Sequence, residues 1–340
     1  MTDGQRVLVV GGSGFLGGHV VRALVAAGHR VTVLSRGVRP APAEAEPLNA
    51  DRRDTASLAA ALEGRRFDFT VDFAAYDAGD IERLLLIPYA ALGRYVMIST
   101  GQVCLVTSAP HMPYREEDSE HPLIPEPPAG TPDHREWAYG VGKRRAEGVL
   151  LSLRATHGMR AIILRIPVML GEGDSSLRTW AYLERMLDGG PLLVPEGGSG
   201  PVRFLYAGDL ARVVARLVTT PPPRSAGYHL AQPDMPTRRE VLERMAALAG
   251  VPPRLVDASD AELAAAGLDR SCSPYSGPWV SVLDPARAAG EWGFLARRLD
   301  EYLPEIVRWH LENRPARSHA GYVRRGGELE LAARLVAGAR

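Results

Sequence analysis

Tyr139 and Lys143 are the residues whose types and spacing point most directly to chemistry. The chain has 40 Lys plus Arg residues, and Lys143 is the single lysine among them. On a helix, positions i and i+4 share a face, so this spacing would bring the Tyr139 phenol close to the Lys143 ammonium. A neighbouring cation lowers the pKa of a tyrosine from its usual value of about 10. The pair could therefore act as a general acid or base, and the alternative is a solvated helix face that kept one lysine by chance.

The choice of lysine at position 143, in a chain that otherwise uses arginine, suggests a position where arginine cannot take its place. Lysine is a compact ammonium whose pKa moves with its surroundings, whereas arginine is a broad planar cation that stays charged. Gly140 and Gly142 would each cost a helix about 1 kcal/mol relative to alanine. Close packing of the helix against a sheet or cofactor would explain these glycines, and a frayed helix start is the alternative.

A second chemical signature lies near the N-terminus, where a glycine-rich turn separates an expected strand from an expected helix. Glycines at such a turn let the backbone approach a pyrophosphate that is held at the helix N-terminus. The spacing Gly11-x-x-Gly14-x-x-Gly17 in this context predicts dinucleotide binding. The expected cofactor-binding residues here are Gly11, Gly14, Phe15, Leu16 and Gly17.

The end of the second expected strand indicates which dinucleotide binds. A carboxylate there would accept hydrogen bonds from the adenosine ribose, but the chain has Ser35 and Arg36 instead. A hydroxyl and a guanidinium suit a 2′-phosphate, so NADP is favoured over NAD. Asp51 could accept a hydrogen bond from the adenine amino group, and an ordinary loop aspartate is the alternative.

These residues need a scaffold, and strands alternate with helices along the first half of the chain. This alternation predicts an α/β fold with a doubly wound parallel Rossmann sheet and a smaller, interleaved C-terminal substrate domain. The Pro- and Ala-rich segment 38–50 is expected to be loop. The expected strands are 7–10, 31–34, 68–73, 95–98, 161–164 and 227–231. The expected helices between them are a stretch that follows the glycine cluster 11–18 and runs to about Ala27, and then 55–63, 80–91, 139–156 and 209–219.

The same pattern predicts the domain boundaries. We expect a dinucleotide-binding domain over 1–170, to which 207–232 returns as a helix and a strand. Residues 171–206 and 233–314 are expected to form the substrate-binding domain, and 315–340 a peripheral appendage.

Residues 107–132 form an insertion that is too long for an ordinary connection, and such loops are typically lids or binding loops. In and after it lie further acid or base candidates, for which solvated surface charges are the favoured interpretation. These candidates are His111, Glu116, Glu117, His121, His134 and Glu136.

Composition excludes several classes of protein. The formal net charge is zero, which gives no reason to expect nucleic acid or an anionic membrane as partner. Cys104 and Cys272 cannot build a disulfide framework and match no zinc spacing. The polar N-terminus is unlike a signal peptide, and no stretch has the length of a membrane span. We therefore expect a cytoplasmic protein with a small-molecule substrate, and the sequence permits a homodimer.

Taken together, these motifs resemble the extended form of the short-chain dehydrogenase/reductase superfamily, which includes nucleotide-sugar epimerases and dehydratases. The resemblance covers about residues 1–312, and the order and context of its motifs all agree. The motifs are Gly11-x-x-Gly14-x-x-Gly17, Asp72-Phe73-Ala74-Ala75, Ile98-Ser99-Thr100-Gly101-Gln102-Val103, Tyr139-x-x-x-Lys143, Arg165-Ile166-Pro167 and Asp209-Leu210-Ala211.

The resemblance implies roles for individual residues. Tyr139 would be the acid/base, and Lys143 would hold the nicotinamide ribose and depress the pKa of the Tyr139 phenol. Thr100 would donate a hydrogen bond to the substrate oxygen, with Ser99 as the rival for that role. The remaining implied cofactor contacts are Ala74 and Ala75 along the dinucleotide and Pro167 and Val168 beside the nicotinamide.

Three departures from the family pattern bear on the reaction. Gln102, an expected substrate contact like Thr100 and Arg203, occupies a position where dehydratases and decarboxylases have a glutamate. An amide cannot carry a proton, so elimination by that route is disfavoured. Cys104 replaces a common tyrosine and is either a second base or, as we favour, a buried thiol. Arg203 resembles a pyrophosphate-binding arginine of nucleotide-sugar enzymes but lacks the aspartate that follows it there.

Three functions remain open on the sequence. The leading hypothesis is an NAD(P)-dependent epimerase-type enzyme that oxidises a hydroxyl of a nucleotide sugar or related polyol and returns the hydride. The second is an NADPH-dependent ketoreductase of a secondary metabolite. The third is a non-catalytic dinucleotide-binding relative, which the intact set of Thr100, Tyr139 and Lys143 disfavours.

Overall fold

The structure, a computed structural model, describes residues 4–85, 88, 91–109 and 112–338. Its contacts group the chain into two compact units. Unit 1 consists of Met1–Met169, Leu205–Ala231 and Ser281–Ala296, and unit 2 consists of Leu170–Phe204, Gln232–Val280 and Arg297–Arg340.

The segment Ser281–Ala296 belongs to unit 1, whereas the sequence assigned it to the substrate domain. The backbone N–H of Tyr114 donates to the carbonyl of Val282 at 2.8 Å, which ties this segment to the insertion. A contact between positions so far apart in the chain leaves no local pattern in the sequence.

Unit 1 contains one parallel sheet, in which seven strands of the described residues follow the order β10-β6-β5-β4-β1-β2-β3. The strands are β1 (Arg6–Val10), β2 (Arg30–Ser35), β3 (Glu46–Asn49), β4 (Phe69–Asp72), β5 (Arg94–Thr100), β6 (Ala161–Ile166) and β10 (Gly227–His229). From β1 the chain adds β2 and β3 on one side, and it then returns to the other side of β1 to add β4 and the later strands. The order of strand addition therefore changes direction between β1 and β4. In such sheets the crevice at the carboxyl ends of these two strands is where ligands bind.

Strand β3 lies within the segment that we expected to be loop. It pairs with β2 alone and forms an edge of the sheet. An edge strand tolerates Pro47, which has no N–H to donate, and needs no continuous apolar run. The expectation of loop was therefore wrong, because an edge strand of this composition looks like coil.

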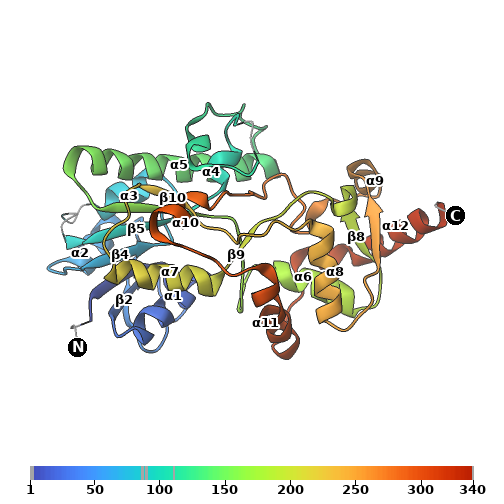
Figure 1. Ribbon diagram of the computed structural model, residues 1–340, viewed down its shortest axis with the longest axis horizontal. Coiled ribbons are helices and arrows are strands. Elements are labelled where there is room, and N and C mark those ends of the chain that lie inside the picture. Colours follow the sequence, from blue (N-terminus) through green and yellow to red (C-terminus); the bar gives the residue numbers. More distant parts are fainter. Residues whose placement is uncertain (1–3, 86–87, 89–90, 110–111, 339–340) are drawn as a thin grey trace. The chain divides into compact units, whose positions relative to one another are not determined.

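Helices cover both faces of the sheet, which confirms the doubly wound α/β prediction (Figure 1). One face carries α1 (Phe15–Ala26) and α7 (Ala207–Thr219). The other carries α2 (Thr55–Leu62), α3 (Ala78–Leu84) and α5 (Pro132–His157). Part of the expected helix 80–91 lies outside the described residues.

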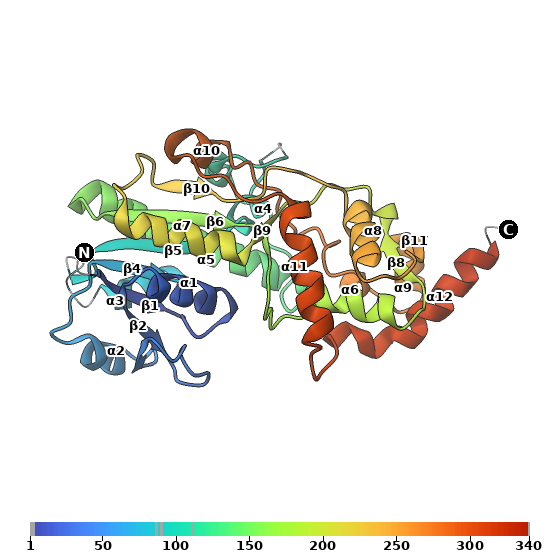
Figure 2. The ribbon, with the colours of Figure 1, turned by 60° about the horizontal axis from the view of Figure 1, so that its bottom comes forward.

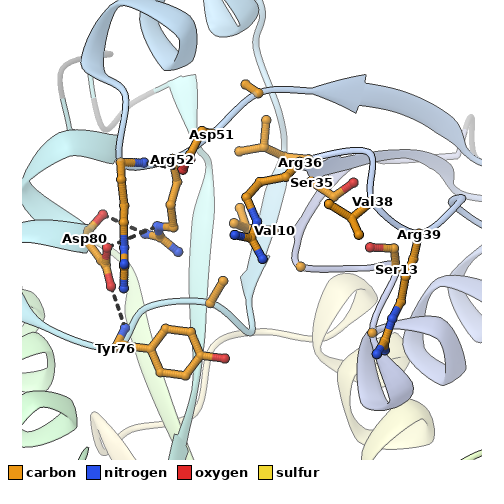
Figure 3. Close-up of a pocket in the computed structure, with 16 residues that line it drawn as sticks. Val10, Ser13, Ser35, Arg36, Val38, Arg39, Asp51, Arg52, Tyr76 and Asp80 are labelled. Atoms are coloured by element: carbon orange, nitrogen blue, oxygen red, sulfur yellow. Dashed lines mark hydrogen bonds and ion pairs between the residues drawn. The ribbon is translucent and has the colours of Figure 1, made fainter. Parts of the chain in front are cut away.

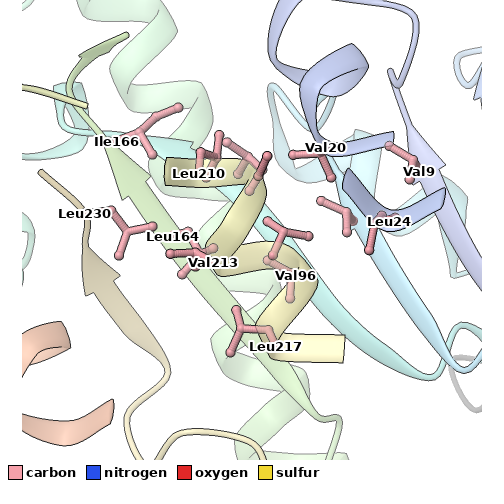
Figure 4. Close-up of a cluster of buried hydrophobic side chains, with 14 of the residues drawn as sticks. Val9, Val20, Leu24, Val96, Leu164, Ile166, Leu210, Val213, Leu217 and Leu230 are labelled. Atoms are coloured by element: carbon pink, nitrogen blue, oxygen red, sulfur yellow. The ribbon is translucent and has the colours of Figure 1, made fainter. Parts of the chain in front are cut away.

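The strands are apolar on both sides because each face of the sheet has its own core. Val7 and Val9 point into the core under α1 and α7, and Leu8 and Val10 point into the core under the other helices. Figure 4 shows the first of these cores, where α7 lies over the central strands. Burial of apolar surface on both faces fixes the carboxyl edge of the sheet and the loops on it.

Unit 1 is completed by three short elements and two strands at the boundaries between units. These are α4 (Gln102–Leu105), the short 3-10 helix η2 (Glu116–Glu120), α10 (Ala286–Trp292), β7 (Val168–Leu170) and β9 (Phe204–Tyr206).

Unit 2 is mainly helical and contains a two-stranded parallel ladder (Figure 2). Its helices are α6 (Arg178–Leu187), α8 (Arg238–Leu248), α9 (Asp260–Ala265), α11 (Leu299–Glu312) and α12 (Arg325–Gly338). The ladder joins β8 (Leu192–Pro195) to β11 (Leu255–Ala258), and the 3-10 helices are η3 (Glu196–Gly198), η4 (Arg270–Cys272) and η5 (Ala320–Arg324). Among the residues described, no helix is long and apolar enough to cross a membrane.

Helix α12 is part of the core of unit 2 rather than a peripheral appendage. Arg185 is fully buried and donates from Nε and Nη2 to the Glu328 carboxylate at 2.8 and 2.6 Å. Leu331 and Ala332 lie in the hydrophobic cluster of unit 2. The prediction that 315–340 is a peripheral appendage was therefore wrong. The segment is rich in arginine and resembles a surface helix in the sequence, but its Glu328 pairs with the buried Arg185.

Candidate active site

The glycine turn joins β1 to α1 with little space for side chains. Gly11 has a φ of +81°, a conformation that favours glycine. A Cβ on Gly17 would lie 2.5 Å from the carbonyl oxygen of Gly11, so α1 contacts the turn backbone directly. Gly14 is the N-cap of α1 and offers no side-chain cap, and the first turn contains no acidic residue. The free N–H groups at this helix start can therefore receive an anion.

A cavity of about 580 Å³ opens beside this turn at the carboxyl ends of β1, β2 and β4 (Figure 3). Its volume is in the range of small-molecule sites. Glycine backbone on one wall and arginine side chains on others suit a ligand that carries phosphates, so these residues fit part of a dinucleotide. The lining residues are Val10, Gly11, Ser13, Gly14, Leu34, Ser35, Arg36, Val38, Arg39, Ala50, Asp51, Arg52, Arg53, Ala74, Tyr76 and Asp80.

Three exposed arginines of this lining are available to a ligand. Among the described residues, no carboxylate lies within ion-pair distance of Arg36, Arg39 or Arg53. The hydroxyl of Ser35 accepts the backbone N–H of Gly37 at 3.3 Å, which shapes the turn after β2. Figure 3 shows Arg36 and Arg39 on the side of the cavity formed by this turn.

Arg52 also lines the cavity, yet it is already paired. Its Nη1 donates to both oxygens of the buried Asp72 at 2.8 and 3.0 Å, and its Nη2 donates to the carbonyl of Asp80 at 2.6 Å. Although burial by itself would lower the pKa of the Arg52 guanidinium, the Asp72 carboxylate raises it overall. Arg52 therefore holds the ends of β4 and α3 together, a role that sequence reasoning missed.

The other expected cofactor contacts fall into two groups. Asp51 and Ala74 line the cavity, and the Asp51 carboxylate accepts the backbone N–H of Arg53 at 2.9 Å. The rest do not line it. Phe15 and Leu16 pack against the core under α1, Gly17 packs against the turn backbone, and Ala75 is fully buried. Pro167 and Val168 follow β6, whose Ile166 pairs with Thr100, and Tyr139 and Lys143 lie on α5.

Lys143 is buried in α5, with 2% of its surface exposed. Its Nζ donates to the carbonyl oxygen of Ile98 at 3.0 Å and lies 5.0 Å from the centre of the Tyr76 ring. Burial lowers the pKa of the Lys143 ammonium to about 8, against the opposing effect of the Asp72 and Glu147 carboxylates. The single lysine therefore lies in the interior and not on a solvated helix face.

Tyr139 lies one turn before Lys143 on the same helix and is partly buried. Its ring centre is 6.3 Å from that of Tyr76. Gly140 and Gly142 are well inside α5, which rules out a frayed helix start. A Cβ on Gly140 would lie 2.6 Å from Val106, and a Cβ on Gly142 would lie 2.5 Å from the carbonyl oxygen of Tyr76. Close packing therefore explains both glycines.

The structure separates Thr100 from its rival Ser99. Ser99 is 2% exposed and donates to the Glu147 carboxylate at 2.5 Å, so its hydroxyl is committed to the interior. Thr100 is half-buried, and its hydroxyl accepts the backbone N–H of Gln102 at 3.3 Å. Because consecutive strand residues point to opposite faces, only one of the two can face a ligand, and Thr100 is the one with an exposed surface.

The two other expected substrate contacts have protein partners. The buried side-chain amide of Gln102 is hydrogen-bonded to the Glu136 carboxylate of α5. Arg203 belongs to unit 2, where its Nη2 donates to the carbonyl of Pro233 at 2.9 Å.

A buried polar cluster joins the insertion to β6 and β10, and no pattern in the sequence predicted it. Arg165 donates to the Glu147 carboxylate at 2.8 Å and to the carbonyl of Glu116 at 2.7 Å. The Glu116 carboxylate accepts the backbone N–H of His229 at 2.9 Å. Burial raises the pKa of the Cys104 thiol to about 12, and burial lowers that of His229 to about 3, so both are neutral at ordinary pH. Cys104 is thus a buried thiol.

The cluster corrects the interpretation of the insertion as a set of solvated charges. Glu116 is 7% exposed and anchors the insertion, whereas Glu117 is exposed and pairs with Arg287. His121 lies 3.9 Å from the buried Asp118 carboxylate, His134 lies 3.0 Å from the exposed Glu126 carboxylate, and His111 lies outside the described residues. No group of three or more metal-ligating side chains occurs in the part of the chain that the structure describes.

The parallel sheet, the glycine turn and the Tyr139–Lys143 helix define an enzyme of the extended short-chain dehydrogenase/reductase type. The model of the NAD dependent epimerase/dehydratase family matches residues 7–229. The chain belongs to that family and is an NAD-dependent enzyme of this type.

Individual relatives are similar over most of the chain. The 2′-dehydrokanamycin reductase of Streptomyces kanamyceticus is 28% identical over 351 aligned residues, covering 98% of this chain and 92% of the relative. The 3-diazoavenalumate denitrifying reductase of a Streptomyces species is 27% identical over 262 residues, covering 73% and 83%. A dTDP-glucose 4,6-dehydratase from Streptomyces venezuelae, solved with NAD bound, shares the fold with a TM-score of 0.67 and 23% identity, covering 91% of this chain and 98% of that one.

Proposed function

We propose that the protein is an NADPH-dependent reductase that acts on a ketone of a sugar or related polyol. The observation that carries this proposal is the arginine-rich lining of the cavity, where Arg36 and Arg39 in the turn after β2 and Arg53 after β3 have no carboxylate partners among the described residues. Guanidinium groups bind a 2′-phosphate through charge-assisted hydrogen bonds. A carboxylate in their place would have favoured the 2′-hydroxyl of NAD.

Each catalytic residue then has a defined task. When bound, the reduced nicotinamide supplies a hydride to the carbonyl carbon. Tyr139 donates its phenolic proton to the carbonyl oxygen, and Thr100 donates a hydrogen bond to the same oxygen. Lys143 uses one N–H on the carbonyl of Ile98, which leaves two for the nicotinamide ribose and the Tyr139 oxygen.

Net reduction is better supported than the epimerase-type reaction that led on the sequence. The two curated relatives reported above are named as reductases, and one of them spans nearly the whole chain. Gly101 and Gln102 supply no proton carrier at the position that dehydratases use, and the Gln102 amide is held by Glu136. An epimerase-type enzyme would recycle its cofactor, so the two functions differ in whether cofactor is consumed.

The deciding experiment measures cofactor preference and stoichiometry. The purified protein is titrated with NADPH and NADH, and then assayed with a panel of oxidised sugars and aminoglycosides for equimolar NADPH loss and alcohol formation. We expect preferential NADPH binding, and Arg36→Ala should weaken it roughly 10-fold or more, as expected for one charged hydrogen bond. Arg66→Ala, an exposed arginine outside this cavity, is the matched control. Tightly bound NAD that is recycled without net loss would refute the reductase and support the epimerase-type reaction.

A further inference from the structure

Tyr76 has an unusual position for an aromatic residue. It remains 48% exposed, and it lines the cofactor cavity on the same side as Asp80 (Figure 3). On its other side the ring lies over the Lys143 ammonium, 5.0 Å from ring centre to Nζ. This distance is within the range of a cation–π interaction.

The backbone of Tyr76 is held from two sides, which fixes where its side chain starts relative to Lys143. The Asp80 carboxylate accepts the backbone N–H of Tyr76 at 2.8 Å, and Arg52 in turn binds the carbonyl of Asp80. From the opposite side Gly142 brings α5 against the carbonyl of Tyr76. The backbone position of Tyr76 therefore follows from the same packing that requires a glycine at 142.

The charged groups around Lys143 leave it without a direct counter-ion. Asp72 and Asp80 face it from β4 and α3, and both are engaged by Arg52. Glu147 faces it from α5 and is engaged by Arg165. Asp77, the N-cap of α3, pairs with the exposed Arg145, and the partly buried Tyr139 is the remaining titratable neighbour.

Within the described residues no carboxylate lies at ion-pair distance from Lys143, although the side chain is buried. A desolvated ammonium in this situation gains more from an aromatic face than an exposed one does. The ring quadrupole offers the ammonium partial negative charge without removing a proton from it.

We propose that Tyr76 is a positioning residue whose ring keeps the Lys143 ammonium charged and directed toward the nicotinamide ribose and Tyr139. The role of Lys143 in holding the nicotinamide ribose and Tyr139 rests on the proposed function. The contact between the Tyr76 ring and the Lys143 ammonium does not, because it is present in the protein without cofactor. The phenolic hydroxyl of Tyr76 takes no part, so phenylalanine should replace it.

The single lysine makes a direct test feasible. Protein labelled with ¹³C at the lysine ε-carbon gives one lysine resonance, and its shift through the lysine titration range reports the pKa of Lys143 without cofactor. Tyr76→Phe should leave this pKa within a few tenths of wild type, and Tyr76→Leu should lower it by about one unit, the size expected for a desolvated cation–π contact. A Tyr76→Leu protein with an unchanged or raised pKa would overturn the proposal, since the ring would then only exclude water.

A second series covers the case in which Tyr76→Leu does not fold. Phenylalanines with increasing numbers of ring fluorines at position 76 keep the shape of the ring and weaken its quadrupole, so the Lys143 pKa should fall in step with fluorination. A constant pKa across the series would refute the proposal. Because these titrations contain neither NADPH nor substrate, their result is independent of whether the enzyme proves to be a reductase.

Discussion

Replacing Lys143 by methionine should stabilise the protein while it abolishes turnover. The ammonium is 2% exposed and has its pKa lowered from 10.5 to about 8 by burial. At about 1.36 kcal/mol per pKa unit, holding the charged form in the folded protein at neutral pH costs roughly 3 kcal/mol. Methionine would fill the same volume without this cost, but it would leave the carbonyl of Ile98 without its donor, which costs about 1 kcal/mol. We expect a net gain of about 2 kcal/mol.

The stability difference between wild type and Lys143→Met should depend on pH. Because the folded-state pKa of Lys143 is lower than the unfolded-state value, the unfolded chain binds more protons between about 8 and 10.5. The stability of the wild type should therefore rise relative to that of Lys143→Met as the pH increases through this window. Below it the difference should be constant and favour the methionine variant.

The assay is urea unfolding of both proteins at several pH values, followed by a fluorescence signal and by circular dichroism. NADPH binding and turnover are measured on the same preparations, and the methionine variant should lose both. A Lys143→Met protein that is less stable than wild type at neutral pH, or a stability difference that does not change above pH 8, would refute the account of Lys143 as a desolvated ammonium.

Three further predictions concern other contacts. Gly142→Ala places a Cβ 2.5 Å from a backbone oxygen and should lower the free energy of unfolding by about 1–3 kcal/mol. In the same helix a Cβ on Gly148 meets nothing within 4 Å, so Gly148→Ala should raise that free energy by roughly 0.5–1 kcal/mol. Thermal unfolding of both variants measures the difference, and equal effects would contradict the prediction. Glu328→Leu leaves Arg185 buried without its partner and should lower the free energy of unfolding, measured with denaturant, by about 3–5 kcal/mol. Adding Arg185→Met to this variant should restore much of the lost stability. A Glu328→Leu protein as stable as wild type would count against a buried ion pair. Tyr139→Phe should reduce kcat by about 10²–10⁴ with little change in NADPH binding, as measured by single-turnover kinetics, and unchanged kcat would exclude Tyr139 as the proton donor.

Much of the cofactor-binding scaffold could be predicted from local sequence. The glycine turn, the strand–helix alternation and the pairing of Tyr139 with Lys143 at i and i+4 are all short-range patterns, and they predicted the strands of the sheet other than β3 and the helix that carries Tyr139 and Lys143. The turn after β2 likewise showed Ser35 and Arg36 without a carboxylate. Such patterns are informative because backbone geometry and helical periodicity act over only a few residues.

Contacts between distant positions were not predictable. In the sequence, Arg52 is one of many loop arginines. Only its hydrogen bonds to Asp72 and to the carbonyl of Asp80 show that it links β4 to α3. The polarity of Glu116 suggested a solvated lid, but Arg165 and His229 bury it. Long-range ion pairs of this kind depend on which segments the fold brings together, and no local spacing encodes that.

Local patterns in the sequence were enough to predict a dinucleotide-binding parallel α/β sheet and a helix that carries both Tyr139 and Lys143. The packing of the strands then distinguishes Ser99 from Thr100, because Glu147 takes the Ser99 hydroxyl and Thr100 stays half-buried. It also decided that the one lysine is desolvated beneath Tyr76. The reason is physical: a residue type fixes which interactions are available, and the fold fixes which of them are made and how much water remains.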